Sequence, residues 1–173
     1  MTPRTKNPDH THHIMDRRDN ALATITHYVP FIQFMGIEFD HKGGELTAVL
    51  PYDDKLIGNP LLPALHGGAT AAFLETAAVV ALMFDILWKD IESRTLDVDK
   101  LNQMAETPPD FPKTIDFTVD YLRPGLSRNA YARAHIKRRG RRYASVHTET
   151  WQDDRDRPFA QAVGHFLMPV HGG

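Results

Sequence analysis

The sequence predicts an α+β domain in which an antiparallel sheet of about six strands wraps around one long central helix. The helix is indicated by residues 69–84, an apolar run with one charge, Glu75, and no proline or glycine. This is the pattern of a helix buried on nearly all sides. The strands are indicated by residues 114–168, where apolar side chains recur at every second position between short turns. Two strands expected before the helix complete the sheet.

Three elements are expected ahead of the long helix. They are a short helix at 20–28 that Asn20 caps and Pro30 ends or bends, a hairpin of strands 34–41 and 45–52 with a glycine pair in its turn, and a loop at 53–63. Asn59, within that loop, is either a turn residue or an amide aimed at a substrate.

A polar segment at 89–112 follows the helix and ends in three prolines. It is expected to be a long loop, either a lid or binding loop or a simple insertion. The strands that follow are expected at 114–121, 130–137, 143–150 and 159–168. In the first of them, strict alternation assigns Thr114 to one face with Asp116, Thr118 and Asp120, and Ile115, Phe117, Val119 and Tyr121 to the other.

Length and composition bound the class of protein. The 173 residues suit one domain at 20–173, preceded by a flexible polar tail at 1–19 that lacks the apolar segment of a secretory signal. A net charge of −2 argues against a nucleic-acid-binding protein. The absence of cysteine excludes disulfides and thiolate sites, and it fits a reducing, cytoplasmic location.

Neither a metal site nor a membrane span is predicted. The cluster of His10, His12 and His13 can bind a metal, but it lies in the tail and is typical of exposed, disordered chain. His66, Glu75 and Asp85 interrupt the apolar region around the long helix, which leaves stretches shorter than the roughly 20 residues of a span.

Glu75 is the anomaly of the long helix. Its neighbours three and four residues away, Ala71, Ala72, Ala78 and Val79, cannot pair with it. An unpaired buried carboxylate costs several kcal/mol, and a cost of this kind indicates a role in chemistry. The alternatives are an arginine partner from elsewhere in the fold, or a place at the wet end of a cleft.

The helix begins after Leu65-His66-Gly67-Gly68, so its free N–H groups could bind an oxyanion. The alternative is a loop in which the glycines only give backbone freedom. Glu75 lies eight residues after Gly67, about 12 Å along the helix axis. If both residues are catalytic, Glu75 must therefore serve a site that begins with the Gly67 of another subunit, as in a two-fold dimer.

These motifs together resemble a known family. Asn59, the sequence LHGG at 65–68, an acidic residue nine positions after His66, and TIDFTVDYLRPG at 114–125 are similar to the PaaI-type acyl-CoA thioesterases of the hotdog fold. The resemblance covers roughly residues 31–168. It implies an acyl-CoA substrate, no cofactor, and a homodimer that pairs into a dimer of dimers.

The resemblance also implies roles for individual residues. The Gly67 N–H would stabilise the oxyanion, with Gly68 beside it at the substrate, and Glu75 would act as general base or nucleophile. Asn59 would orient the thioester or water, Thr114 would hydrogen-bond near Glu75, and His66 would orient the loop or the substrate.

A basic run, 137–142, allows two interpretations. It is either a solvated hairpin tip or a site where Arg138 and Arg139 bind the phosphates of coenzyme A, and Arg123 has the same ambiguity. A nucleic-acid patch would need more stacking aromatics than Tyr143 alone. Two other functions stay open on the same fold, namely hydration or dehydration of an acyl thioester and non-catalytic binding of acyl-CoA.

Overall fold

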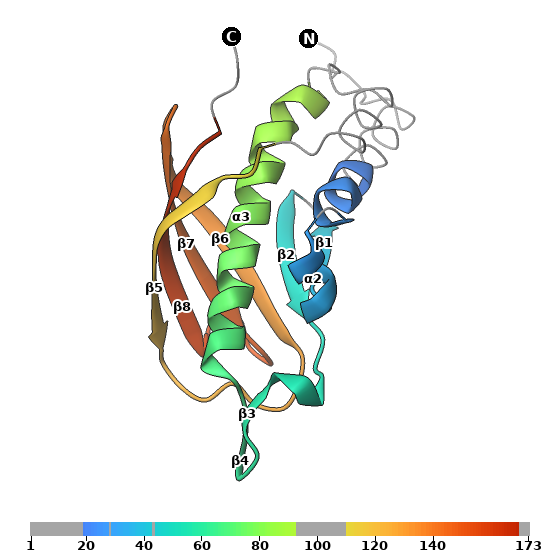
Figure 1. Ribbon diagram of the computed structural model, residues 1–173, viewed down its shortest axis with the longest axis vertical. Helices are drawn as coiled ribbons and strands as arrows, with labels where there is room; N and C mark the ends of the chain where they lie inside the picture. The colour runs from blue at the N-terminus through green and yellow to red at the C-terminus, as the bar shows by residue number, and fades with distance from the viewer. Residues whose placement is uncertain (1–18, 28, 43, 93–109, 170–173) are drawn as a thin grey trace, which may run out of the picture.

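The computed structural model describes residues 19–27, 29–42, 44–92 and 110–169, and the side chains of 88–92 are not described. Helix α3 (Gly67–Glu92) runs along the concave side of a six-stranded sheet (Figure 1). The predicted α+β architecture of a hotdog fold is confirmed. Residues 1–18 of the predicted tail at 1–19 and most of the predicted loop at 89–112 lie outside the described residues, whereas Asp19 belongs to a helix.

Every pair of neighbouring strands in the sheet is antiparallel, in the order β1-β2-β6-β7-β8-β5. The strands are β1 (Glu38–Lys42), β2 (Glu45–Leu50), β5 (Lys113–Tyr121), β6 (Ala130–Arg139), β7 (Tyr143–Trp151) and β8 (Ala160–Leu167). The four strands predicted after the helix are therefore confirmed. Strand β5 forms one edge of the sheet, and this edge borders α3.

Small side chains allow the sheet to approach the helix closely. Ala130 and Ala132 of β6 and Ala160 and Ala162 of β8 are buried beneath α3. The helix fills the space with larger side chains, among them Phe73, Leu74, Val80 and Leu82, which are also buried. Burial of apolar area on this scale is the main source of stability for such a domain.

Gly164 is the tightest of these contacts. A Cβ atom at this position would lie 2.5 Å from Cδ2 of Phe117 and 2.8 Å from Cε2 of Phe166, two rings that pack edge to face. We expect Gly164→Ala to lower the free energy of unfolding by about 1–3 kcal/mol because the rings must move, measured by urea denaturation. Val163→Ala on the exposed face of the same strand is the control, with a change within about 0.5 kcal/mol. Equal stability of the two variants would contradict the packing argument.

The region before α3 differs from the prediction in two places. Pro30 begins a second short helix, α2 (Pro30–Met35), after a first helix at 19–27, so residues 34–37 do not belong to a strand. Proline suits the first position of a helix because its missing N–H would have no partner there. The predicted loop at 53–63 contains a 3₁₀ turn (Asp54–Leu56) and a small hairpin of β3 (Ile57–Asn59) and β4 (Leu62–Leu65).

The β1–β2 hairpin is joined to the rest of the sheet by a short ladder. Strand β2 pairs with β6 only from Ala48 to Leu50, and the two strands then separate around a groove of about 630 Å³. Arg133 of β6 bridges this groove, because its Nε donates to Thr47 Oγ1 at 2.9 Å and its guanidinium group pairs with Glu45.

Helix α3 is not buried on all sides in the single chain, contrary to the prediction. Ala72, Glu75, Thr76 and Val79 are half-buried along the side of the helix that faces β5. The stretch Gly67–Leu87 is long and apolar enough to cross a membrane by length and composition, although Glu75 and Asp85 interrupt it. Most of it is buried inside the fold, as expected for a core helix.

Strand β5 carries an irregularity that changes which side chains face the helix. Thr114 pairs with Phe166, but Asp116 pairs with the preceding residue, His165, so Ile115 is an extra residue in the ladder. Thr114 therefore lies on the helix face, opposite to the face that strict alternation predicted, while Ile115 is exposed. Phe117, Val119 and Tyr121 share one face, as alternation predicted, and this is the helix face, since their partners in β8 are buried there.

Candidate active site

His66 caps the first turn of α3. Its ring Nδ1 accepts a hydrogen bond from the Gly68 N–H at 2.9 Å, and its carbonyl oxygen accepts from the Thr70 N–H at 3.0 Å. Because Nδ1 is the acceptor, the imidazole is neutral with its proton on Nε2. A Cβ on Gly68 would lie 3.0 Å from that same Nδ1, so the second glycine makes room for the cap.

The peptide group between Gly67 and Gly68 is held at both of its polar atoms. The Tyr121 hydroxyl donates to the Gly67 carbonyl oxygen at 2.8 Å, while His66 accepts from the Gly68 N–H. In the described part of the chain, the preceding N–H, that of Gly67, has no acceptor. The fold thus fixes the direction of one free N–H at a helix N-terminus, where the helix dipole favours negative charge.

The segment before the hairpin positions His66. The backbone N–H of His66 donates to the carbonyl oxygen of Leu56 at 2.7 Å, at the end of the 3₁₀ turn. That turn is capped by Asp53, whose Oδ1 accepts from the Lys55 N–H at 3.0 Å, and this bond lowers the pKa of the Asp53 carboxyl. Gly58 lies so close to His66 that a Cβ on it would be 2.9 Å from the His66 Cα.

Glu75 lies two turns further along α3 and contacts β5. The Thr114 hydroxyl donates to Glu75 Oε1 at 2.6 Å, which the ladder irregularity at Ile115 makes possible. Within the described residues this is the one hydrogen bond of the carboxylate, and no arginine or lysine pairs with it. One oxygen is thereby oriented, and the other is left for a further donor such as water.

The two parts of the site do not meet within one chain. Eight residues separate Gly67 from Glu75, which corresponds to about 12 Å along the helix axis. Both parts nevertheless lie on the β5 edge, since Tyr121 at one end of the strand contacts Gly67 and Thr114 at the other end contacts Glu75.

The structure places the other predicted residues apart from this edge. Asn59 lies at the exposed β3–β4 turn, where its Oδ1 accepts from the Leu61 N–H at 3.0 Å. Arg123 follows β5 and donates to the carbonyl oxygen of Arg157 at 3.4 Å. Arg139 forms an ion pair with Asp85 of α3, and Arg138 is exposed beside Ser145 on the outer face of the sheet.

Tyr121 is a site residue that the sequence reasoning did not identify as such. Alternation placed its side chain on the same face as Phe117 and Val119, but nothing in the sequence links it to a residue 54 positions earlier. Among the described residues, no group of three His, Asp or Glu side chains is placed to hold a metal ion.

The match to known proteins agrees with this arrangement. A family model described as "Acyl-CoA thioesterase N-terminal domain" matches residues 59–167, more than half of the chain and both parts of the site. The chain belongs to the acyl-CoA thioesterase family. The resemblance inferred from the sequence is thereby confirmed at the level of this family of thioester hydrolases.

Individual relatives of this acyl-CoA thioesterase family member are moderately similar. A Salmonella typhimurium protein named medium/long-chain acyl-CoA thioesterase YigI is 28% identical over 130 residues, which cover 74% of this chain and 79% of that protein. A crystal structure from Chromobacterium violaceum is 34% identical, with a TM-score of 0.58 and coverage of 91% of this chain and 97% of the other. A Bacillus halodurans structure determined with CoA shares the fold at 20% identity, a TM-score of 0.59, and coverage of 97% and 99%.

The cap on α3 gives a prediction for this thioesterase family member. We expect His66→Ala to lower the free energy of unfolding by about 1 kcal/mol, because the Gly68 N–H loses its acceptor. His66→Asn should recover most of that loss, since asparagine is a favourable capping residue. Urea unfolding of both variants measures the effect, and equal stability of the alanine variant and the wild type would contradict the capping role.

Proposed function

We propose that this protein hydrolyses acyl-CoA thioesters at a site shared between two subunits. The observation that carries the proposal is the pair of groups on the β5 edge, a free Gly67 N–H and a carboxylate, Glu75, oriented by Thr114. Membership of the acyl-CoA thioesterase family and the names of the bacterial relatives support the reaction. Those relatives also favour a medium or long acyl chain as the substrate.

In this mechanism the thioester carbonyl points at the N-terminus of α3. The Gly67 N–H stabilises the oxyanion that forms, a contribution of about 3–4 kcal/mol for a single donor. Glu75 either removes a proton from the attacking water, after which the C–S bond breaks and the CoA thiolate leaves with a proton, or attacks the carbonyl carbon itself, which expels the thiolate and leaves an acyl anhydride that water hydrolyses. Thr114 holds one carboxylate oxygen, and His66, with Gly68, fixes the loop that carries the donor.

Assembly is required because the two groups lie about 12 Å apart in one chain. The β5 edge suits a two-fold interface, since no strand of the described chain pairs with its outer side and it exposes Ile115 and Tyr121. Two β5 strands that pair across a two-fold axis run antiparallel. The Tyr121 end of one strand, with its Gly67, then lies beside the Thr114 end of the other, with its Glu75.

Release of free thiol from a panel of acyl-CoAs tests the reaction. Hydrolysis releases CoA thiol in proportion to the free acid, and the proposal predicts the highest kcat/KM for medium or long acyl chains. Hydration of an enoyl-CoA would instead change the absorbance of the conjugated thioester without releasing thiol. Binding of acyl-CoA without either signal would identify a non-catalytic binding protein, and both of these outcomes would overturn the proposal.

A further inference from the structure

Tyr121 joins the last residue of β5 to the first residue of α3. Its hydroxyl donates to the Gly67 carbonyl oxygen at 2.8 Å, and a Cβ on Gly67 would lie 3.4 Å from both Cζ and Oη of the tyrosine. A carbonyl group at the start of an α-helix already accepts from the N–H four residues later, so the tyrosine bond is an addition to the helix. Because Tyr121 is 55% exposed in the single chain, this bond contributes little to the stability of the fold.

Two successive glycines make the start of α3 conformationally free. Glycine adopts a wide range of φ and ψ, so the peptide groups around Gly67 need restraints from outside their own backbone. The peptide group between Gly67 and Gly68 has two such restraints, the His66 ring at its N–H and the Tyr121 hydroxyl at its carbonyl oxygen. The preceding peptide group is held at its own carbonyl by the Thr70 N–H, so the direction of the free Gly67 N–H depends on the angles at Gly67.

The strand that carries Tyr121 is itself firmly held. Tyr121 pairs with Ala160 of β8, and the next two N–H groups of the chain both donate to the carbonyl oxygen of Phe159, at 2.9 and 3.1 Å. The loop beyond them also contacts the segment before the helix, since the Leu65 N–H donates to the Gly125 carbonyl oxygen at 2.8 Å. The hydroxyl of Tyr121 therefore reaches Gly67 from a fixed part of the sheet.

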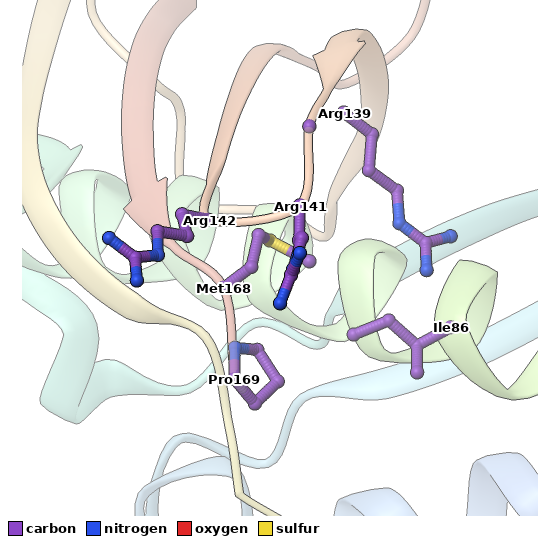
Figure 2. A pocket seen from close by; sticks show the side chains of 7 residues that line it. Ile86, Arg139, Arg141, Arg142, Met168 and Pro169 are labelled. Carbon is purple, nitrogen blue, oxygen red and sulfur yellow. The ribbon is translucent and has the colours of Figure 1, made fainter. Parts of the chain in front are cut away.

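The far end of α3 is too distant to restrain Gly67. A pocket of about 300 Å³ lies there, lined by Ile86 of the helix, by the β6–β7 turn and by the residues that follow β8 (Figure 2). Ile86 comes nineteen residues after Gly67, which corresponds to about 28 Å along the helix axis. Among the described residues, Tyr121 is the one side chain from a strand that forms a hydrogen bond with Gly67.

We propose that Tyr121 is a positioning residue of the oxyanion hole, which acts through the Gly67 carbonyl to hold the Gly67 N–H toward the thioester oxygen. The inference rests on the proposed function. Tyr121 exchanges no proton and touches no reacting atom. An amide that is already oriented needs no reorganisation when negative charge develops, so the effect of Tyr121 falls on the transition state and not on substrate binding.

Tyr121→Phe tests this role because it keeps the ring and removes the hydroxyl. We expect kcat for acyl-CoA hydrolysis to fall by about tenfold, the loss of one hydrogen bond, while KM stays within about twofold. Tyr131→Phe is the matched control, since Tyr131 stacks on Trp151 on the other face of the sheet. It should keep the kcat of the wild type, and thermal unfolding of both variants should match the wild type. An unchanged kcat in Tyr121→Phe would overturn the proposal.

A double variant distinguishes positioning from a general structural effect. Gly67→Pro removes the N–H that Tyr121 is proposed to orient. In that background, Tyr121→Phe should change kcat by less than about twofold, because two residues that act through one group are not additive. A loss of about tenfold in both backgrounds would show that Tyr121 acts by another route and would overturn the proposal.

Backbone relaxation measured by nuclear magnetic resonance tests the restraint without requiring catalysis. The order parameter of the Gly67 N–H should be about 0.85, the value of rigid backbone, in the wild type and in Tyr131→Phe, and should fall toward about 0.6 in Tyr121→Phe. Equal order parameters in all three proteins would overturn the proposal. If the wild type hydrolyses no acyl-CoA, the proposed reaction fails, and the order parameters still decide whether Tyr121 holds this amide.

Discussion

Replacing Glu75 with glutamine is expected to lower kcat for acyl-CoA hydrolysis by about 10³-fold, within the range for loss of a general base. Glutamine keeps the size of the side chain and an oxygen that can accept from the Thr114 hydroxyl, so it removes the charge and little else. Stopped assays of thiol release give kcat and KM. Little change in KM is expected, because the carboxylate acts mainly on the attacking water.

The interpretation depends on an intact fold. Thermal unfolding and size-exclusion chromatography of Glu75→Gln should match the wild type, since the side chain is half-buried and has one hydrogen bond within the described residues. Glu75→Ala should lose turnover to the same extent. If both variants keep most of the activity of the wild type, Glu75 is not the reactive carboxylate.

A hybrid dimer of two inactive variants is expected to recover activity. Gly67→Pro removes the free N–H at the first position of α3, where proline is tolerated, and should lower kcat by about 10²–10³-fold. A dimer of one Gly67→Pro subunit and one Glu75→Gln subunit has one site with both defects and one site with neither. Such a dimer should therefore show about half of the wild-type turnover, because two-fold symmetry gives two equal sites.

Gly67→Ala is the matched control, because alanine keeps the N–H and its Cβ would lie 3.4 Å from the Tyr121 ring. This variant should retain most activity both alone and in hybrids. The hybrid is isolated with two different affinity tags and assayed for thiol release. A purified hybrid that is as inactive as its two parents would show that each site lies within one subunit.

The sheet after the helix could be predicted from the sequence because its strands alternate regularly. Each of β6, β7 and β8 places small or apolar residues on the helix face, so periodicity alone found both the strands and their orientation. The long helix was found from composition. Its half-buried side was not, because alanine and valine occur equally on a buried face and beside an open sheet edge.

The irregular elements could not be predicted in the same way. Strands β3 and β4 have three and four residues, which is too few for a period to appear, and β4 also contains a proline. Pro30 was read as the end of a helix, although proline also suits the first turn of the next. One extra residue at Ile115 moved Thr114 to the helix face, and a ladder irregularity of this kind has no clear sequence signal.

In the candidate site, too, the features formed by adjacent residues could be predicted and the contacts between distant residues could not. The free N–H lies within adjacent residues, His66 to Gly68, and local sequence pointed to it, but not to the cap that the His66 ring forms. The contacts of Gly67 with Tyr121 and of Arg139 with Asp85 join residues 54 positions apart. Such contacts depend on how α3 lies across the sheet, so the sequence alone could name the groups but not their partners.

Because the ladder between β2 and β6 is short, the β1–β2 hairpin can open locally while the rest of the sheet stays folded. Among the described residues, three residue pairs and the Arg133 bridge join the β1–β2 hairpin to β6, whereas β5, which contacts Glu75, lies at the other end of the sheet. Local opening is easiest where few backbone hydrogen bonds must break. The hairpin can therefore fray, or accept insertions, while the β5 edge of the sheet keeps its shape.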